Sequence, residues 1–297
     1  MDKSIRFGFH TSVAGALCNA PLEASRYGYG AFQIFASSSR SWKTSPIAVD
    51  DAVLFRKYVK STDTLPFVHI PYLCNPSSPE PEVHRHSAEM LSDNIRRCDS
   101  LGISDLVIHL GSHKGKGIKY GIDTAVQTIA AAIDRTGTKK VRILLENGAG
   151  YSNSVGSKME EIGSIISSLP SEKIGLCLDT CHAFAAGYDL RDAESVDRLA
   201  NLIESQIGTS KIGLTHLNDS KYELGSGLDR HYYLGRGFIG IGGLQLFMEN
   251  SAFSKGSFIM ETPVAEDGTH EGDLSAAESI ARAAKLQITR SRPLRQQ

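Results

Sequence analysis

The amino-acid sequence predicts a (β/α)₈ barrel. Short runs rich in β-branched and aromatic residues recur along the chain, each followed by a polar turn and then by a segment with helical periodicity. Eight such units fit the 297 residues, and this alternation over such a length is typical of an α/β barrel. An open, doubly wound sheet is the alternative, because it shows the same alternation.

The strand signal occurs, in order, at residues 6–9 (RFGF), 31–35 (AFQIF), 67–69 (FVH), 106–109 (LVIH), 141–146 (VRILLE), 174–179 (IGLCLD), 212–216 (IGLTH) and 258–261 (FIME). Helical periodicity lies between these segments, for example at 51–61, 87–102, 124–135, 159–169 and 196–208. Several of these segments end in Gly or Pro, as helices commonly do. No low-complexity linker divides the chain, so we expect residues 1–297 to form a single barrel domain.

The composition argues against a membrane protein and against a disulfide-built secreted protein. No apolar run approaches the roughly 20 residues that span a bilayer, and the start of the chain, MDKSIRFGFHTS, lacks the apolar region of a signal peptide. The five cysteines are odd in number and irregularly spaced. We therefore expect a cytoplasmic protein. A net charge of −1 argues against a broadly basic nucleic-acid binder but allows a local basic face.

Six of the eight predicted strands end in a residue that can bind a metal or transfer a proton. Barrel enzymes carry their chemistry at these carboxyl ends. A single histidine there is more often a structural residue, but six coincidences argue against that explanation. The residues are His69, His109, Glu146, Asp179, His216 and Glu261. Three further candidates lie off the strand ends: His182 follows Asp179 by three residues, and Asp229 and His231 lie in the loop after the seventh predicted strand.

This set of side chains indicates a metal centre. Carboxylates packed closely together repel one another and become protonated unless cations compensate their charge. A mixture of imidazole and carboxylate ligands suits Zn²⁺, and also Mn²⁺ or Fe²⁺, better than Mg²⁺ or Ca²⁺. Metal ions that share a bridging carboxylate are one arrangement used for phosphodiester cleavage.

Six motifs resemble, in order, the signatures of the endonuclease IV family. They are HLGSH (109–113), LLENGAG (144–150), CLDTCHAFAAGYDL (177–190), HLNDSK (216–221), DRHYYLGRGFIG (229–240) and METP (260–263). Members of this family are zinc-dependent apurinic/apyrimidinic endonucleases of base-excision DNA repair. Their fold is a (β/α)₈ barrel that holds three zinc ions, and the resemblance extends over nearly the whole chain.

The resemblance implies three zinc ions, with Mn²⁺ as an alternative at some positions. The implied ligand groups are His69, His109 and Glu146; Glu146, Asp179, His216 and Glu261; and His182, Asp229 and His231. Glu146 would bridge two zinc ions, and a metal-bridging hydroxide would attack the phosphodiester 5′ to an abasic site in duplex DNA. The products would be a 3′-hydroxyl and a 5′-deoxyribose phosphate. We expect the chain to act as a monomer.

The resemblance also implies that two loops, 37–46 and 69–79, enter the minor groove of DNA. The candidate DNA-contact residues are Arg40, Ser41, Tyr72 and Leu73, of which Arg40, Tyr72 and Leu73 match the inserting positions of the family. This chain departs from the family pattern at Ser41, at Pro71 and at Leu110, which affects the expected DNA contacts but no expected metal ligand. The lysines of HKGKGIKYG (Lys114, Lys116 and Lys119) are candidate phosphate contacts or a solvated loop.

Two other functions are compatible with parts of the sequence. A metal-dependent sugar isomerase or epimerase on the same barrel would use Glu146, Asp179, His216 and Glu261, but would leave the other five candidate ligands without a role. A non-catalytic DNA-lesion binder would keep the loops but should have lost ligands. All nine candidate ligands are present, which favours catalysis.

Several residues have a simpler structural interpretation. GRGFIG (235–240) fits the dinucleotide pattern G-x-G-x-x-G but lacks the preceding strand that this fingerprint requires. We expect Asp219 to orient His216 or a neighbour. The remaining residues of this kind are His84 and His86 at a helix start, His10 at the barrel mouth, Trp42 as a loop anchor, and Cys177 and Cys181 without a metal role, a thiolate site being the alternative.

Overall fold

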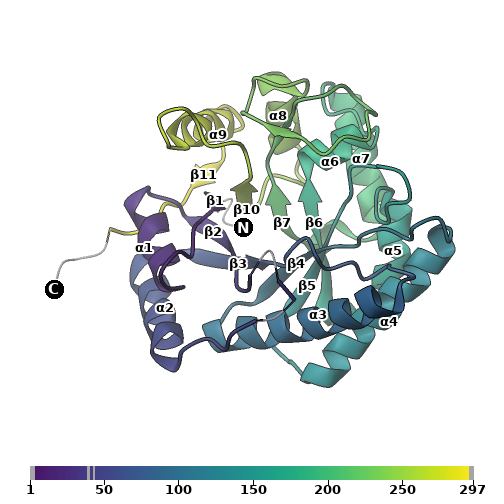
Figure 1. Ribbon diagram of the computed structural model, residues 1–297. Helices are drawn as coiled ribbons and strands as arrows, with labels where there is room; N and C mark the ends of the chain where they lie inside the picture. Colours follow the sequence, from purple (N-terminus) through teal and green to yellow (C-terminus); the bar gives the residue numbers. More distant parts are fainter. Residues whose placement is uncertain (1–3, 39–40, 43, 294–297) are drawn as a thin grey trace.

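The computed structural model describes residues 4–38, 41–42 and 44–293. Within these residues, eight parallel strands form a closed barrel in the order β10-β7-β6-β5-β4-β3-β2-β1, and β1 pairs with β10 (Figure 1). The barrel strands are β1 (Ser4–His10), β2 (Ala31–Phe35), β3 (Leu65–His69), β4 (Asp105–His109), β5 (Arg142–Glu146), β6 (Ile174–Asp179), β7 (Ile212–His216) and β10 (Gly256–Met260). Since the first and last strands pair, the predicted barrel is confirmed and the open sheet is excluded.

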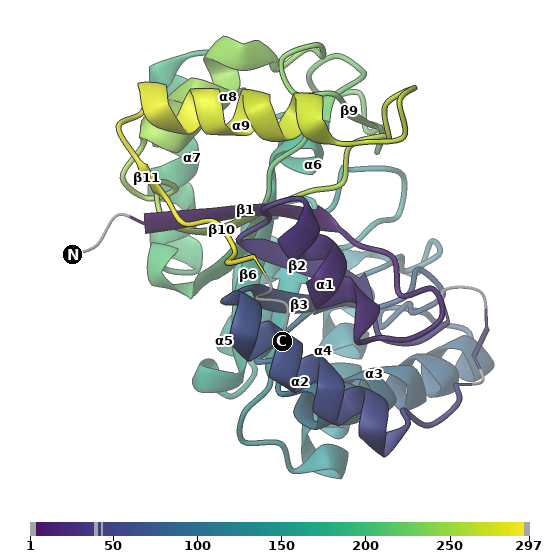
Figure 2. The same ribbon diagram turned by 90° about the vertical axis from the view of Figure 1, so that its left-hand side faces the viewer.

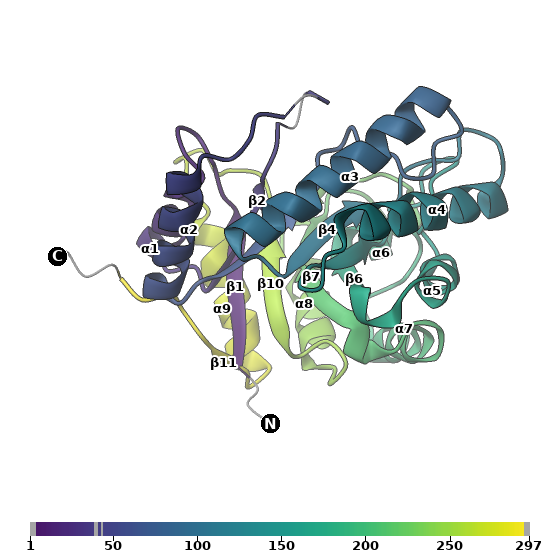
Figure 3. The same ribbon diagram turned by 90° about the horizontal axis from the view of Figure 1, so that it is seen from below.

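Helices surround the barrel on its outside, and Figure 3 shows α3 and α4 side by side beneath it. The helices are α1 (Asn19–Arg26), α2 (Val49–Thr62), α3 (Pro81–Leu101), α4 (Ile118–Thr136), α5 (Met159–Ser167), α6 (Thr180–Ala185), α7 (Ala193–Gln206), α8 (Gly240–Glu249) and α9 (Glu271–Ala283). The helix predicted at 87–102 begins earlier, at Pro81, because proline is well suited to a first helical turn. It ends before Gly102, which has a left-handed φ of 71°.

In the described part of the chain, three short strands lie outside the barrel. β11 (Gln287–Ile288) pairs with the start of β1 and ties the end of the described chain to its beginning (Figure 2). β8 (Asp219–Ser220) and β9 (His231–Tyr232) pair antiparallel, in a two-stranded sheet of their own. Single-turn 3₁₀ helices, η1 (Ser171–Lys173) and η2 (Thr209–Lys211), directly precede β6 and β7.

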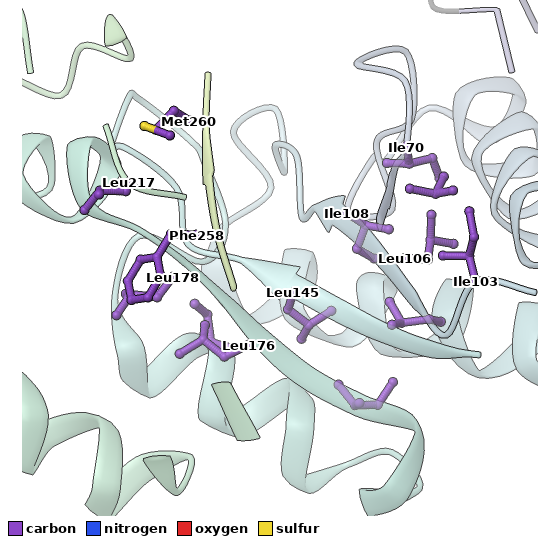
Figure 4. Packing of buried hydrophobic residues seen from close by; sticks show 14 of the residues in the cluster. Ile70, Ile103, Leu106, Ile108, Leu145, Leu176, Leu178, Leu217, Phe258 and Met260 are labelled. Carbon is purple, nitrogen blue, oxygen red and sulfur yellow. The ribbon is translucent and has the colours of Figure 1, made fainter. Parts of the chain in front are cut away.

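The core has two parts because alternate residues of a strand face opposite sides. Inside the barrel lies a cluster made of Ala31, Phe67, Val107, Leu144, Cys177, Leu214 and Ile259. The intervening positions, such as Ile108, Leu145, Leu176 and Leu178, pack in the larger cluster outside it (Figure 4). Each such side chain, when fully buried, contributes about 1.5–3 kcal/mol.

The same alternation positions the last residue of each strand. Val107 and His109 share the inner face of β4, and Cys177 and Asp179 share the inner face of β6. The side chains at the strand ends therefore point over the barrel mouth, above its apolar interior.

None of the helices in the described part of the chain is long and apolar enough to cross a membrane.

Candidate metal centre

Five of the predicted site residues occupy the last position of a barrel strand, as the sequence predicts. They are His69, His109, Glu146, Asp179 and His216. Glu261 is an exception, because β10 ends at Met260 and Glu261 lies one residue beyond it. The pairing register sets His109 beside Glu146, and Asp179 beside His216.

The carboxylate of Glu146 lies between two sets of imidazoles. Its Oε2 is 3.0 Å from His69 Nε2 and 3.4 Å from His109 Nδ1. Its Oε1 is 2.9 Å from His216 Nδ1. Each oxygen of this buried carboxylate thus faces a different group of potential metal ligands.

His216 faces two further carboxylates. Its Nδ1 is 3.4 Å from Glu261 Oε2 and 3.8 Å from Asp179 Oδ2. The ligand atoms of Glu146, Asp179, His216 and Glu261 all lie within 4.8 Å of one another. Glu146 therefore belongs both to this group and to the group of His69 and His109.

A third group lies at the edge of the mouth. His182 Nε2, on the first turn of α6, is 3.1 Å from Asp229 Oδ1. His231 Nε2, on β9, is 3.5 Å from the same oxygen and 3.3 Å from His182 Nε2. All nine residues predicted as ligands are therefore brought together in these groups.

The hydrogen bonds of the third group indicate a cation. His182 Nδ1 lies 2.9 Å from the backbone oxygen of Asn147, and His231 Nδ1 lies 3.3 Å from that of Glu261. Because a carbonyl oxygen only accepts, both Nδ1 atoms donate, and both Nε2 atoms carry a lone pair when the rings are neutral. Two lone pairs cannot bond to each other, whereas a bound cation would satisfy both.

The tautomer of His216 can be assigned in the same way, from its hydrogen-bond partner. Gln33 Nε2 donates to Glu261 Oε1 at 2.7 Å, so the Gln33 oxygen is the atom that faces His216 Nε2, at 2.9 Å. His216 therefore donates from Nε2 and directs the lone pair of Nδ1 at the carboxylates. This is the ligand geometry of a metal-binding histidine, so the donor set fits a divalent metal.

The pKa shifts of the buried carboxylates and imidazoles also indicate a site for a cation. Burial alone would raise the pKa of Glu146, but His216 and the hydrogen bonds from His216 and His69 hold it well below its ordinary value. Burial also disfavours charge on His182 and His216, yet the surrounding acidic groups raise the pKa of both imidazoles well above the usual value. Protons on these rings supply the positive charge that a metal ion would supply in the same position.

A comparison with known proteins identifies the family. A model of the family described as "Xylose isomerase-like TIM barrel" matches residues 21–286. The probable endonuclease 4 of Methanoculleus marisnigri is 41% identical over 278 residues, which cover 93% of this chain and 99% of that protein. The probable endonuclease 4 of Cenarchaeum symbiosum is 39% identical over 282 residues, covering 93% and 100%. The chain belongs to the endonuclease IV family.

Solved structures agree with this assignment to a family of nucleases. Endonuclease IV from Thermus thermophilus superimposes with a TM-score of 0.82 and 31% identity, covering 94% of this chain and 98% of that one. A D-tagatose 3-epimerase-like protein superimposes with a TM-score of 0.68 at 20% identity, covering 94% and 97%. The second similarity shows the barrel fold alone.

In this endonuclease IV family member, three amides hold the candidate ligands in place. Gln33 bonds to His216 and Glu261 as described above. Asn218 Nδ2 donates to Asp179 Oδ2 at 2.7 Å, and Asn147 Oδ1 accepts from the backbone N–H of Asp179 at 2.7 Å. None of these three amides is predicted from the sequence. A signal for Gln33 was available, because it is the one polar residue in the strand run AFQIF.

Asp219 is predicted to orient His216 or a neighbour, and the first of these two alternatives is wrong. Within the described residues, the Asp219 carboxylate accepts from the backbone N–H groups of Ser220, Gly235, Gly237, Ile239 and Gly240. It lies on β8, beyond the end of β7, and is fully buried. Asp219 therefore organises a loop, and Gln33 holds His216.

The predicted DNA-contact residues have different surroundings. Arg40 lies outside the described residues, and Ser41 is half-buried. Tyr72 is 65% exposed, and its ring stacks on that of His109 with centroids 5.4 Å apart. Leu73 is half-buried against the hydrophobic core. Of Ser41, Tyr72 and Leu73, Tyr72 is thus the one that presents a large exposed surface beside the metal centre.

A cavity of about 420 Å³ opens beside the centre. Tyr72, His109, Tyr151 and Asp229 line it together with Lys114. Lys119, another of the predicted phosphate contacts, instead pairs with Asp123 on α4 at 2.8 Å. Of the lysines in this loop, Lys114 is therefore the one that lines this cavity.

The structural interpretations of the remaining polar residues are confirmed in part. His84 Nε2 bonds to Thr128 Oγ1 at 2.7 Å, and His86 stacks on Trp42 with ring centroids 5.1 Å apart. These contacts hold α3 to α4 and anchor the loop of Trp42. His10 ends β1, with its Nδ1 3.8 Å from Glu261 Oε1.

The two cysteines of CLDTCH differ from each other. Cys177 is buried inside the barrel, where burial raises the pKa of its thiol to about 12, so it packs as an apolar residue. Cys181 lies closer to the candidate metal ligands than the sequence suggests, because its sulfur is within 4.8 Å of ligand atoms of Asp179 and His231. Burial also raises the pKa of the Cys181 thiol, which disfavours the thiolate that binds metals.

The raised imidazole pKa values lead to a prediction for the metal-free protein. A raised histidine pKa contributes stability that is present below the ordinary pKa of about 6.5 and is lost as the pH rises through the raised value. The melting temperature of chelator-treated protein should therefore fall as the pH rises above about 6.5 and through the raised pKa values of His182 and His216. Zinc-loaded protein should show a smaller fall, because the metal keeps the compensating charge. Calorimetry on both forms checks this, and parallel curves for the two forms would contradict it.

Replacing Gln33 with leucine should weaken metal binding. The Gln33→Leu variant removes the acceptor that fixes His216 and the donor that fixes Glu261, and loss of such a partner typically lowers metal affinity roughly 10–100-fold. Competition with a chromophoric zinc chelator measures the affinity. Gln245→Leu is the matched control, since Gln245 bonds only at the exposed surface of α8. Equal affinities in the two variants would rule out this role.

Proposed function

We propose that this chain is a metal-dependent apurinic/apyrimidinic endonuclease of DNA repair. It cleaves the phosphodiester 5′ to an abasic site in duplex DNA and leaves a 3′-hydroxyl and a 5′-deoxyribose phosphate. The observation that carries the proposal is the trio of imidazole–carboxylate groups at one barrel mouth, of which two share Glu146. Membership of the endonuclease IV family supports the same reaction.

The three groups would each hold one zinc ion, with Mn²⁺ as an alternative at some positions. The ligands are His69, His109 and Glu146; Glu146, Asp179, His216 and Glu261; and His182, Asp229 and His231. Metal ions held by these residues would supply Lewis acidity, which makes water a stronger nucleophile near neutral pH, and positive charge, which would offset the negative charge of a phosphate.

The side chains of the protein have distinct tasks in this reaction. Glu146 acts as the catalytic carboxylate, because its two oxygens face two different ligand groups and hold them at a defined separation. Gln33 keeps His216 in the tautomer whose Nδ1 faces the centre. Burial lowers the pKa of His109 to about 4, so this ring stays neutral and available as a ligand at neutral pH.

The loops of the barrel mouth would recognise the damaged duplex. An abasic site has no base to read, so recognition depends on the missing stack and on the ease of bending the duplex. Arg40, Tyr72 and Leu73 are the proposed inserting side chains, with Ser41 as a further contact. The cavity of about 420 Å³ between Tyr72 and Tyr151 adjoins His109 and could receive a sugar-phosphate group.

The proposal extends to the organisation of the chain. Because β10 pairs with β1, residues from both ends of the chain complete one barrel, and we propose a single barrel domain over residues 1–297 that acts as a monomer. Sugar epimerization is the competing activity, since epimerases share the fold. That activity would need Glu146, Asp179, His216 and Glu261 but not the third group of ligands.

Incision of a defined duplex tests this function. A duplex with one tetrahydrofuran abasic analogue should be cut once, 5′ to the lesion, and a polymerase should extend the resulting 3′-hydroxyl. An undamaged duplex of the same sequence is the control, and metal content is measured on the same preparation. Absence of incision at full metal occupancy, together with epimerase activity on a ketose, would overturn the proposal.

Glu146→Gln should nearly abolish incision. An amide cannot offer two negatively charged oxygens to the two neighbouring ligand groups, so the loss should exceed roughly 100-fold in kcat. Single-turnover incision with saturating enzyme measures it. The exposed Glu160→Gln on α5 is the matched control. Turnover close to that of the control would show that Glu146 has no bridging role.

A further inference from the structure

We propose that Asp219 is a positioning residue that assembles the third metal group. This inference rests on the proposed function, because it assumes that His182, Asp229 and His231 bind a metal. The carboxylate of Asp219 holds the loop 235–240 against β8, and β8 in turn carries β9 and His231. Asp219 therefore acts on the metal through the position of this loop, without touching it.

The carboxylate is enclosed by backbone donors. Its Oδ1 accepts from the N–H groups of Ser220 at 2.8 Å and Ile239 at 3.0 Å. Its Oδ2 accepts from Gly235 at 2.9 Å and Gly237 at 3.0 Å, and Gly240 N lies 3.2 Å from the same oxygen. A carboxylate accepts from several donors at once and is satisfied here without any cation.

This arrangement explains the glycine pattern that resembles a dinucleotide fingerprint. In GRGFIG (235–240), as in a phosphate-binding loop, several backbone N–H groups surround an anion, but the anion is the protein's own Asp219, which accepts from Gly235, Gly237, Ile239 and Gly240. Gly237 is required at its position because an added Cβ would lie 2.3 Å from the backbone oxygen of Ser220 and 2.5 Å from Asp219 Oδ1.

The cradle is connected directly to two of the three ligands. Ser220 is paired with His231 across the β8–β9 ladder, and Lys221 N donates to the backbone oxygen of Arg230 at 3.0 Å. Asp229 and His231 are therefore the neighbours of Arg230 in the chain, and the backbone of Arg230 is held by this small sheet. On the other side of β8, Phe238 N donates to Ser220 O at 2.8 Å.

The third group differs in this respect from the other two. His182 belongs to α6, which follows β6 directly, and its ring is fixed by the backbone of Asn147. Asp229 and His231 instead belong to the segment that runs beside α6, outside the barrel (Figure 2). The third group thus has one ligand on the barrel and two on the β8–β9 segment, whereas the other two groups are built on barrel strand ends.

Disturbing the Asp219 cradle should therefore affect only the third of the three metal sites. When the cradle is disturbed, Asp229 and His231 lose their fixed distance from His182, while the first two groups keep theirs. Asp219→Asn is a suitable change, because the amide nitrogen faces backbone N–H donors in either orientation of the side chain. Gly237→Ala disturbs the same cradle from the opposite side.

The experiment measures how many metal ions each variant retains and how tightly. Wild-type protein is expected to hold three zinc ions per chain after dialysis against limiting zinc. Asp219→Asn and Gly237→Ala are expected to hold two, with the affinity for the third lowered at least about 10-fold and the first two affinities unchanged. The matched controls are Gly242→Ala, where an added Cβ meets nothing within 4 Å, and the exposed Asp134→Asn.

Three outcomes would overturn the proposal. The first is retention of a third zinc with wild-type affinity in both variants. The second is loss of all three metals, or failure to fold, in both variants while the controls behave normally, because Asp219 would then be a residue of general stability. The third comes from hydrogen exchange on unmodified, metal-free protein, in which the backbone amides at 235–240 should be protected. Rapid exchange there would show that the cradle does not exist before the metal binds.

These results are distinguishable from a failure of the proposed function. If the wild-type chain binds no third metal, the ligand assignment fails, but protection of residues 235–240 would still report on the cradle. If wild type binds three metals and both variants do as well, the ligand assignment stands and only the role of Asp219 is lost.

Discussion

The barrel mouth is built around buried negative charge that requires positive compensation. Glu146 and Asp179 are fully buried, and each faces at least one imidazole within 4 Å. Carboxylates in such surroundings stay ionised only when cations or hydrogen-bond donors stabilise them. The nearby histidines can supply that charge as protons or direct their lone pairs to a metal. The choice of ligands, the tautomers and the amides that fix them all follow from this requirement.

The fold meets the requirement through strand parity and closure. Because Val107 and Cys177 fill the barrel interior, the residues two positions later, His109 and Asp179, must lie over the same interior at its mouth. Closure by the pairing of β1 with β10 brings Glu261, near the end of the chain, opposite the strand ends of the first half. A rigid, fully paired sheet thus sets the separation of the ligands more accurately than loops could.

Two kinds of hydrogen bonding hold the candidate ligands at the mouth of this rigid barrel. Amides of Gln33 and Asn218 connect ligands from different strands, so the orientation of one ligand depends on that of another. The segment from β8 to α8 is held differently, by backbone donors around the single carboxylate of Asp219. Part of the centre is consequently as rigid as the barrel, and part depends on a loop. A reaction that must admit a large substrate can use both properties, because loops carry contacts that adapt while strand ends keep the ligands in place.

The sequence by itself determined the eight strands, most of the helices and all nine candidate ligands, because these depend on local periodicity, on residue types at strand ends and, for three ligands, on residue spacing in the segments that follow. It misplaced Glu261 by one residue relative to β10, and its first alternative for Asp219, the orientation of His216, is wrong. Only the tertiary structure decided what holds His216 and Glu261. The partners of Gln33 lie 183 and 228 residues away along the chain, and no local pattern encodes such a contact. The glycines of GRGFIG are a second example. They are needed because their backbone surrounds the buried carboxylate of Asp219, a contact that the local sequence does not encode.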